Sequence, residues 1–106
     1  MITIKNTLLE LSQNKVLCEY AKQFNVTPMQ IIAANKTSRI TDIRHLYCKL
    51  RYEKHGLTYL ETGHEIGRHH ATVRYGVMRI NNLIRFNDQR IVAMWGRVKD
   101  IAGWYG

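Results

Sequence analysis

Apolar residues recur at steps of three and four along almost the whole chain, and a single proline interrupts this pattern. Such spacing places apolar side chains on one face of a helix, and the row Val73, Val77, Ile80 and Ile84 is the clearest case. No segment sustains the alternation of apolar and polar residues that marks a half-buried strand. The sequence therefore predicts an all-α fold, a compact bundle of about six helices.

Capping and helix-ending residues predict the boundaries of these helices. Thr27 and Thr58 each begin a Thr-x-x-Gln or Thr-x-x-Glu capping box, and Thr41 is expected to cap the helix between them. Gly56 and Gly67 are expected to end helices, because glycine adopts the left-handed conformation at little cost. The expected helices cover residues 16–24, 28–34, 42–55, 59–66, 68–85 and 89–102.

The length of 106 residues allows one domain with a single modest core. No apolar run approaches the roughly 20 residues that span a bilayer, and the N-terminus has no apolar leader. Cys18 and Cys48 have neither the spacing of a disulfide framework nor that of a zinc site, so we expect both to fill core space. These features predict a single cytoplasmic domain, residues 1–106, that does not bind membranes.

The positive charge is concentrated in the middle of the chain. Residues 36–85 hold ten basic and four acidic side chains, and so account for +6 of the net charge of +8. This excess predicts a polyanionic partner. All five histidines lie there too, but no cysteine or carboxylate completes a zinc-like spacing, and the eight acidic residues are scattered. We therefore expect no metal, no cofactor and no catalytic residue.

Residues 58–85 predict a helix-turn-helix. Gly63 lies four positions before the turn glycine Gly67, and Val73 lies six positions after it, a spacing that suits the close crossing of two helices. In such a unit the N-terminal residues of the second helix meet base edges in the major groove of DNA. Here those residues are Arg68-His69-His70-Ala71-Thr72, most of which can donate hydrogen bonds.

The second helix is expected to turn one face outward. Ala71, Tyr75, Met78 and Asn82 fall opposite the apolar row that begins at Val73, with Arg74, Arg79 and Arg85 at the flanks. A small residue and a planar ring between arginines suit contact with a DNA groove. Met78 could equally pack against a neighbouring element.

The stretch Gly63-His64-Glu65-Ile66-Gly67-Arg68-His69-His70-Ala71-Thr72-Val73 resembles the signature of a known DNA-binding domain. That domain is the C-terminal domain IV of the bacterial replication initiator DnaA, which has a Trp-repressor-like helix-turn-helix. The segments Lys36–Arg39 and Arg44–Leu50 resemble its basic segment and the helix that follows. The resemblance covers about residues 15–85.

The resemblance implies that Arg44 enters the minor groove and that Lys36 and Arg39 approach the DNA backbone. It implies major-groove and phosphate contacts for residues 68–72. His69 stands where the family has an acidic residue that reads a base, Ala71 replaces a Ser or Thr, and one turn glycine replaces two. Because an acidic side chain accepts from cytosine whereas histidine can donate, we do not expect the DnaA target sequence. The chain also lacks the G-x-x-x-x-G-K-[ST] motif of the DnaA ATPase.

We therefore expect a stand-alone domain that binds double-stranded DNA and regulates replication initiation or transcription at the nucleoid. The expected DNA-binding residues are Lys36, Arg39, Arg44, Arg68, His69, His70, Ala71, Thr72, Arg74 and Tyr75. The alternative is a protein-interaction module that binds a replication initiator or another regulator rather than DNA. The sequence leaves open the oligomeric state and the role of Trp104 and Tyr105.

Overall fold

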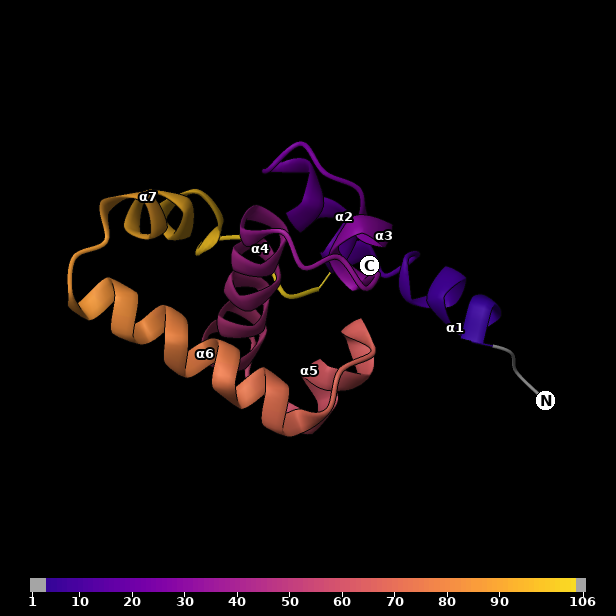
Figure 1. The fold of residues 1–106 in the computed structure, drawn as a ribbon. Helices are drawn as coiled ribbons and strands as arrows, with labels where there is room; N and C mark the ends of the chain where they lie inside the picture. Colours follow the sequence, from indigo (N-terminus) through magenta and orange to yellow (C-terminus); the bar gives the residue numbers. More distant parts are fainter. Residues whose placement is uncertain (1–3, 105–106) are drawn as a thin grey trace.

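The structure, a computed structural model, describes residues 4–104, which form seven α-helices and one π-helical turn and contain no strand (Figure 1). The prediction of an all-α fold is confirmed. The radius of gyration of 13.0 Å is that of a compact chain of about 100 residues. The elements are α1 (Ile4–Leu11), α2 (Lys15–Lys22), α3 (Pro28–Ile32), α4 (Ser38–Lys49), η1 (Leu50–Lys54), α5 (Tyr59–Ile66), α6 (His70–Arg85) and α7 (Gln89–Val98).

Most of the expected boundary signals act as predicted. Thr27 and Thr58 each accept a hydrogen bond from the N–H three residues on, and both capping boxes are complete. Gly56 and Gly67 have positive φ angles of 74° and 66°, in the left-handed region that glycine adopts most easily. Asp88 caps α7 through the N–H of Ile91.

Two expected boundaries are wrong. Thr41 does not cap a helix but lies inside α4, which begins one turn earlier after Thr37. The side chain of Asn35 accepts from both the N–H and the hydroxyl of Thr37, which holds Thr37 in an extended conformation before the helix. The last helix was expected to reach residue 102, but α7 ends at Val98, and Ala102 is exposed beyond it.

Helix α1 was not expected, because the sequence before residue 16 offers only a short apolar pattern. Leu8 and Leu11 are partly buried and pack against the core. The remainder of α1 extends away from the bundle toward the N-terminus (Figure 1). A helix of eight residues gives a weak signal in the sequence.

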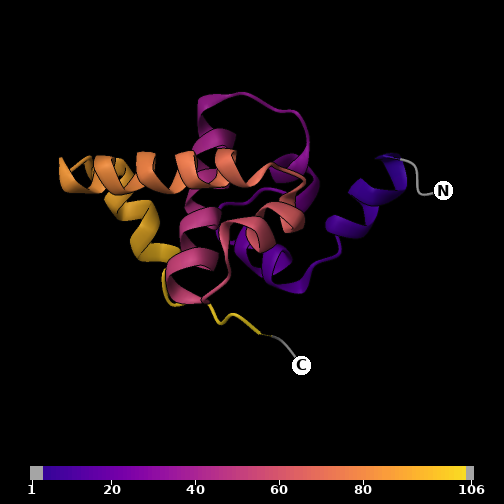
Figure 2. The same ribbon diagram turned by 90° about the horizontal axis from the view of Figure 1, so that it is seen from below.

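The core surrounds α4, which lies between α6 on one side and α2 and α3 on the other (Figures 1 and 2). Tyr20 of α2 and Tyr47 of α4 are fully buried, and their ring centroids lie 5.1 Å apart in an edge-to-face contact. The hydroxyl of Tyr20 donates to the carbonyl of Ile43 at 2.6 Å. This bond satisfies the only polar group of a side chain that otherwise packs as a large apolar one.

Gly76 allows α6 to approach α4 closely. A Cβ atom at Gly76 would lie 2.7 Å from the ring of His45, which is buried between the two helices. Burial, with the positive charges of Arg79 and Arg44 beside it, lowers the pKa of His45 to about 4. The neutral ring can therefore pack beside Arg79, whose Nη1 lies 3.2 Å from Nδ1 of His45.

Gly63 has the corresponding role where α5 meets the start of α6. A Cβ atom there would lie 2.3 Å from the carbonyl oxygen of Arg68 and 3.5 Å from a methyl group of Val73. The first contact is to backbone, so a side chain could not be accommodated by a rotamer change. The expectation that Gly63 and Val73 mark a close crossing is confirmed.

Gly63→Ala is expected to lower the free energy of unfolding by about 2–3 kcal/mol, because the added methyl group overlaps the Arg68 carbonyl. Gly96→Ala in α7 is the matched control, since nothing lies within 4 Å of a Cβ atom at Gly96. The control should be neutral or more stable by up to about 1 kcal/mol, from helix propensity. Urea denaturation followed by circular dichroism measures both, and equal stability of the two variants would contradict the close contact.

Candidate nucleic-acid interface

Helices α5 and α6 form a two-helix unit joined by a short turn at Gly67 (Figure 2). Gly67 is the left-handed C-cap of α5, and His69 is the N-cap of α6. Helix α6 therefore begins at His70, two residues later than the sequence predicts. Arg68 and His69 belong to the turn, and His70, Ala71 and Thr72 form the first turn of the helix.

His69 has a fixed hydrogen-bonding direction. Its Nδ1 accepts from the N–H of Ala71 at 3.1 Å, and an accepting ring nitrogen carries no proton. The proton of the neutral ring is therefore on Nε2, which is free to donate because His69 is exposed. The ring of His70 lies beside it, with centroids 4.2 Å apart. The two imidazoles thus form one exposed polar surface at the start of α6.

The outward face of α6 continues this surface. Ala71, Thr72, Arg74 and Tyr75 are all exposed, as the sequence predicts. Within residues 4–104, Arg74 makes no hydrogen bond or ion pair with another side chain. Tyr75 is 63% exposed and touches the protein through an edge contact with His45. This part of α6 is available to a partner.

Arg68 faces inward, in contrast to its neighbours. Its Nη1 donates to the carbonyls of Ile66 and Ile32, at 3.0 and 2.8 Å, and its Nη2 donates to the carbonyl of Ala33 at 2.9 Å. These bonds join the turn after α5 to the C-terminal end of α3. A guanidinium is well suited to this position, because the last carbonyls of a helix have no partner within the helix.

Arg44 reaches the end of α3 from α4 and is only 7% exposed. Its Nε donates to the carbonyl of Ile31 at 2.6 Å, and its Nη2 donates to those of Ala33 and Asn35 at 3.2 and 3.0 Å. Burial, with the nearby positive charge of Arg68, lowers the pKa of Arg44. We call Arg44 and Arg68 the arginine clamp, since both donate to the carbonyl of Ala33.

The arginine clamp holds two of the DNA-binding residues expected from the sequence. The guanidinium groups of Arg44 and Arg68 both donate to backbone carbonyls inside the protein. Lys36 follows the clamped segment and is exposed. Arg39 is also exposed and donates to the carbonyl of Phe24 at 2.8 Å. The clamp therefore positions the exposed residues around it.

Several other basic side chains counted in the central cluster are neutralised inside the protein. Arg51 donates to both oxygens of Glu65, at 2.9 and 2.6 Å, and is 6% exposed. Lys49 is buried and pairs with Glu53 at 2.5 Å. Both acidic partners are already counted in the +6 of residues 36–85, so these pairs leave that net charge unchanged. Exposed residues such as Lys36 and Arg74 carry part of it.

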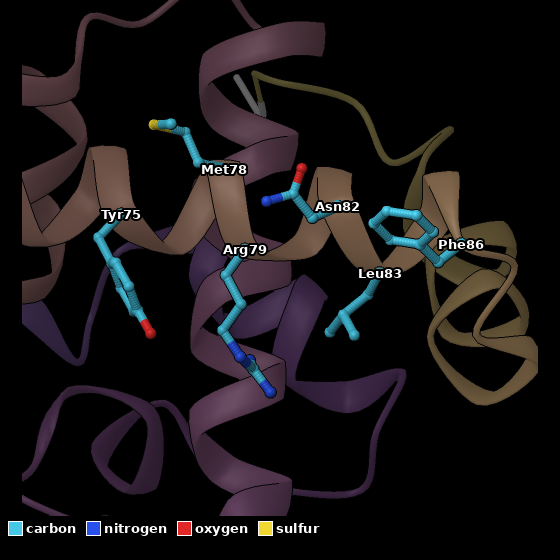
Figure 3. A pocket seen from close by; sticks show the side chains of 6 residues that line it. All are labelled: Tyr75, Met78, Arg79, Asn82, Leu83 and Phe86. Atoms are coloured by element: carbon cyan, nitrogen blue, oxygen red, sulfur yellow. The ribbon is translucent and has the colours of Figure 1, made fainter.

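A shallow apolar groove of about 340 Å³ runs along the C-terminal half of α6, and the sequence analysis missed it (Figure 3). Phe86, 80% exposed, and Met78, 46% exposed, are its largest apolar side chains. Its full lining is Tyr75, Met78, Arg79, Asn82, Leu83 and Phe86. Tyr75, Met78 and Asn82 were expected on this face, but Phe86 follows the helix and lies outside the regular apolar row.

Comparison with known proteins gives no further identification: no family model, no curated protein and no solved structure matches the chain. No helix in the described part of the chain is long and apolar enough to span a membrane. Within residues 4–104, no three His, Cys, Asp or Glu side chains group as a metal site would require. Cys48 is buried as expected, and Cys18 is half-buried. Tyr105 lies outside the described residues, and Trp104 is 79% exposed.

Arg44→Met is expected to lower the free energy of unfolding by about 3 kcal/mol, because it leaves buried carbonyls without a donor. Arg68→Met should cost about 2 kcal/mol for the same reason. Arg74→Met, on the exposed face of α6, is the control and should stay within about 0.5 kcal/mol of wild type. Urea denaturation compares the three, and wild-type stability of Arg44→Met would show that Arg44 is free to leave the clamp.

Proposed function

We propose that this protein binds double-stranded DNA in a sequence-specific manner, with α5 and α6 acting as a helix-turn-helix. The observation that supports this most is the exposed polar surface at the start of α6, from His69 to Tyr75. It follows a tight left-handed turn, which is where a recognition helix contacts base edges. The net charge of +8 supplies the attraction to phosphate that such a protein needs.

The contacts we propose differ from those expected from the sequence alone. Arg74, Lys36 and Thr72 bind backbone phosphates, together with the N–H group of His70 at the start of α6. His69 and His70 face base edges in the major groove. Ala71 and Tyr75 add apolar contacts to the part of the protein surface that enters the groove. Arg44 and Arg68 act indirectly, by holding the turn and the segment that carries Lys36.

The resemblance to domain IV of DnaA supports the same function and suggests its context. We propose that the protein regulates replication initiation or transcription in the cytoplasm, at the nucleoid, and is not an enzyme. The resemblance lies in the turn and in the residues around Arg44 and Arg68. Because those two arginines maintain the fold here, we base the proposal on the exposed face of α6 and not on the family's contact pattern.

With His69 at this position, we expect the protein to prefer a different base from the one that an acidic residue there would select. Since its Nδ1 accepts from Ala71, the neutral ring of His69 presents Nε2–H to DNA. A donor at this position selects an acceptor in the major groove, such as N7 or O6 of guanine. A carboxylate would instead select the amino group of cytosine.

Duplex binding is expected to weaken with salt, with a slope of log K against log salt of about −4.5 for about five phosphate contacts. Arg74→Gln should weaken binding to all duplexes alike and make the slope less steep by about 0.9. Arg85→Gln is the matched control, because Arg85 is exposed on the same helix but lies about 22 Å along it from His70. Fluorescence anisotropy measures the slope, and no duplex binding at low salt would refute the DNA proposal.

Selection of duplexes from a random library tests base reading directly. Wild type and Arg74→Gln are expected to select the same sequence, since Arg74 contacts phosphate. His69→Asp should change the preferred base pair at one position, toward one that presents the cytosine amino group. The same selected sequence for wild type and His69→Asp would mean that His69 does not read a base.

The apolar groove on α6 favours a second candidate function, recognition of another protein. Phe86 lies about 24 Å along the helix from His70, so a major groove about 12 Å wide that holds the start of α6 leaves Phe86 outside. Exposed aromatic side chains beside an arginine are typical of protein interfaces. If the purified protein fails to bind any duplex, the better interpretation is that it is a regulator that binds another protein through this groove.

A further inference from the structure

A second pocket, of about 470 Å³, lies where α4 begins, between the end of α2 and α7. Three of its six lining side chains are arginines, and they come from two different helices. The lining consists of Phe24, Ser38, Arg39, Arg90, Met94 and Arg97. This pocket is separate from the α5–α6 unit, and α7 supplies half of its residues. The sequence of α7 by itself suggests no function.

Contacts within the protein hold each of the three arginines in place but leave other N–H groups free. Arg39 donates through Nη2 to the carbonyl of Phe24 at 2.8 Å, and Arg97 donates through Nη2 to the carbonyl of Gln23. The guanidinium of Arg97 also lies over the ring of Phe24, 5.2 Å from its centroid. Because a guanidinium has five N–H groups, each side chain keeps donors available for a ligand.

The pocket has a positive charge that the protein does not neutralise. Among the residues that the structure describes, no carboxylate lines it. The nearest acidic partner is Asp42, which is 1% exposed and accepts from Nη2 of Arg90 at 2.6 Å. Asp42 also pairs with Arg79 at 2.8 Å, so one carboxylate serves two guanidinium groups. Arg39 and Arg97 have no acidic partner in the described chain.

The start of α4 adds neutral donors beside these charges. Thr37 is the N-cap of this 12-residue helix but makes no capping hydrogen bond with its side chain. Within residues 4–104, the N–H groups of Ser38, Arg39 and Ile40 have no acceptor. Uncapped N–H groups and the helix dipole at this end both favour an anion.

We propose that this pocket binds a phosphate group, with Arg39, Arg90 and Arg97 as its charged ligands and Ser38 as a neutral one. Phosphate suits the pocket better than a carboxylate, because its additional oxygens can accept from several guanidinium groups at once. The group belongs either to the backbone of a bound duplex or to a small phosphate ester. The pocket requires no contact from α6, so the inference holds or fails independently of the proposed DNA recognition.

Ser38→Asp is the most informative variant for this site. Asp at the first position of α4 favours the helix, because a negative charge interacts well with the positive end of the helix dipole. The same carboxylate would occupy the pocket and repel phosphate. We therefore expect the melting temperature to stay equal to that of wild type or rise, while phosphate binding is lost. A folding defect cannot produce this combination.

The probe is inorganic phosphate, titrated into isotopically labelled full-length protein and followed by NMR. In wild type, phosphate should shift the amide signals of residues 38–40 and the side-chain signals of the three arginines. Arg97→Gln should weaken the affinity about tenfold, as expected for loss of one charge-assisted hydrogen bond. Arg85→Gln, an exposed arginine outside the pocket, should leave it unchanged.

Either of two results would overturn the proposal. One is the absence of phosphate-induced shifts at residues 38–40 in wild type, and the other is equal phosphate affinity of wild type, Ser38→Asp and Arg97→Gln. A second titration, with a short duplex, identifies the source of the phosphate. If Arg97→Gln weakens duplex binding but Arg85→Gln does not, the pocket holds a backbone phosphate. If neither variant affects duplex binding, the ligand is a small phosphate ester.

Discussion

The arginine clamp is the interaction on which the rest of the structure depends. Arg44 lies in α4 and Arg68 in the turn between α5 and α6, and both donate to the carbonyl of Ala33 at the end of α3. They satisfy backbone acceptors that a short helix of five residues leaves unpaired. By doing so they fix the turn before α6 and the segment that carries Lys36. The proposed DNA-binding surface is therefore positioned by two cations that do not themselves form part of it.

Basic side chains elsewhere in the protein also bond to partners inside it, and this affects where positive charge is exposed. Buried basic side chains such as Arg51 and Lys49 pair with acidic ones. Arg51 also links distant elements, because it pairs with Glu65 of α5 and donates to the carbonyl of Gly103. Some of the exposed cations gather at two surfaces. One surrounds the start of α6, where Arg74 has no acidic partner in the described chain, and the other is the pocket at the start of α4. A protein with these two surfaces offers separate sites for base recognition and for a phosphate group.

Much of the fold could be predicted from the sequence because its signals are local. The capping boxes at Thr27 and Thr58 and the left-handed glycines Gly56 and Gly67 act over a few residues, and the structure has them as predicted. The start of α4 was predicted wrongly, because Asn35 holds Thr37 extended and the helix begins there instead of after Thr41. Helix α1 was missed because its burial depends on contacts with the rest of the bundle.

For the candidate site, the sequence determined which side chains lie on the outward face of α6, since helical periodicity alone places Ala71, Tyr75 and their neighbours there. It could not determine whether an arginine donates to DNA or to the protein. That depends on where unpaired carbonyls lie in space. Two of the three carbonyls that Arg68 binds, those of Ile32 and Ala33, are more than thirty residues away in the chain. The sequence thus specified the helices and their exposed faces, and only the tertiary structure decided which cations remain free.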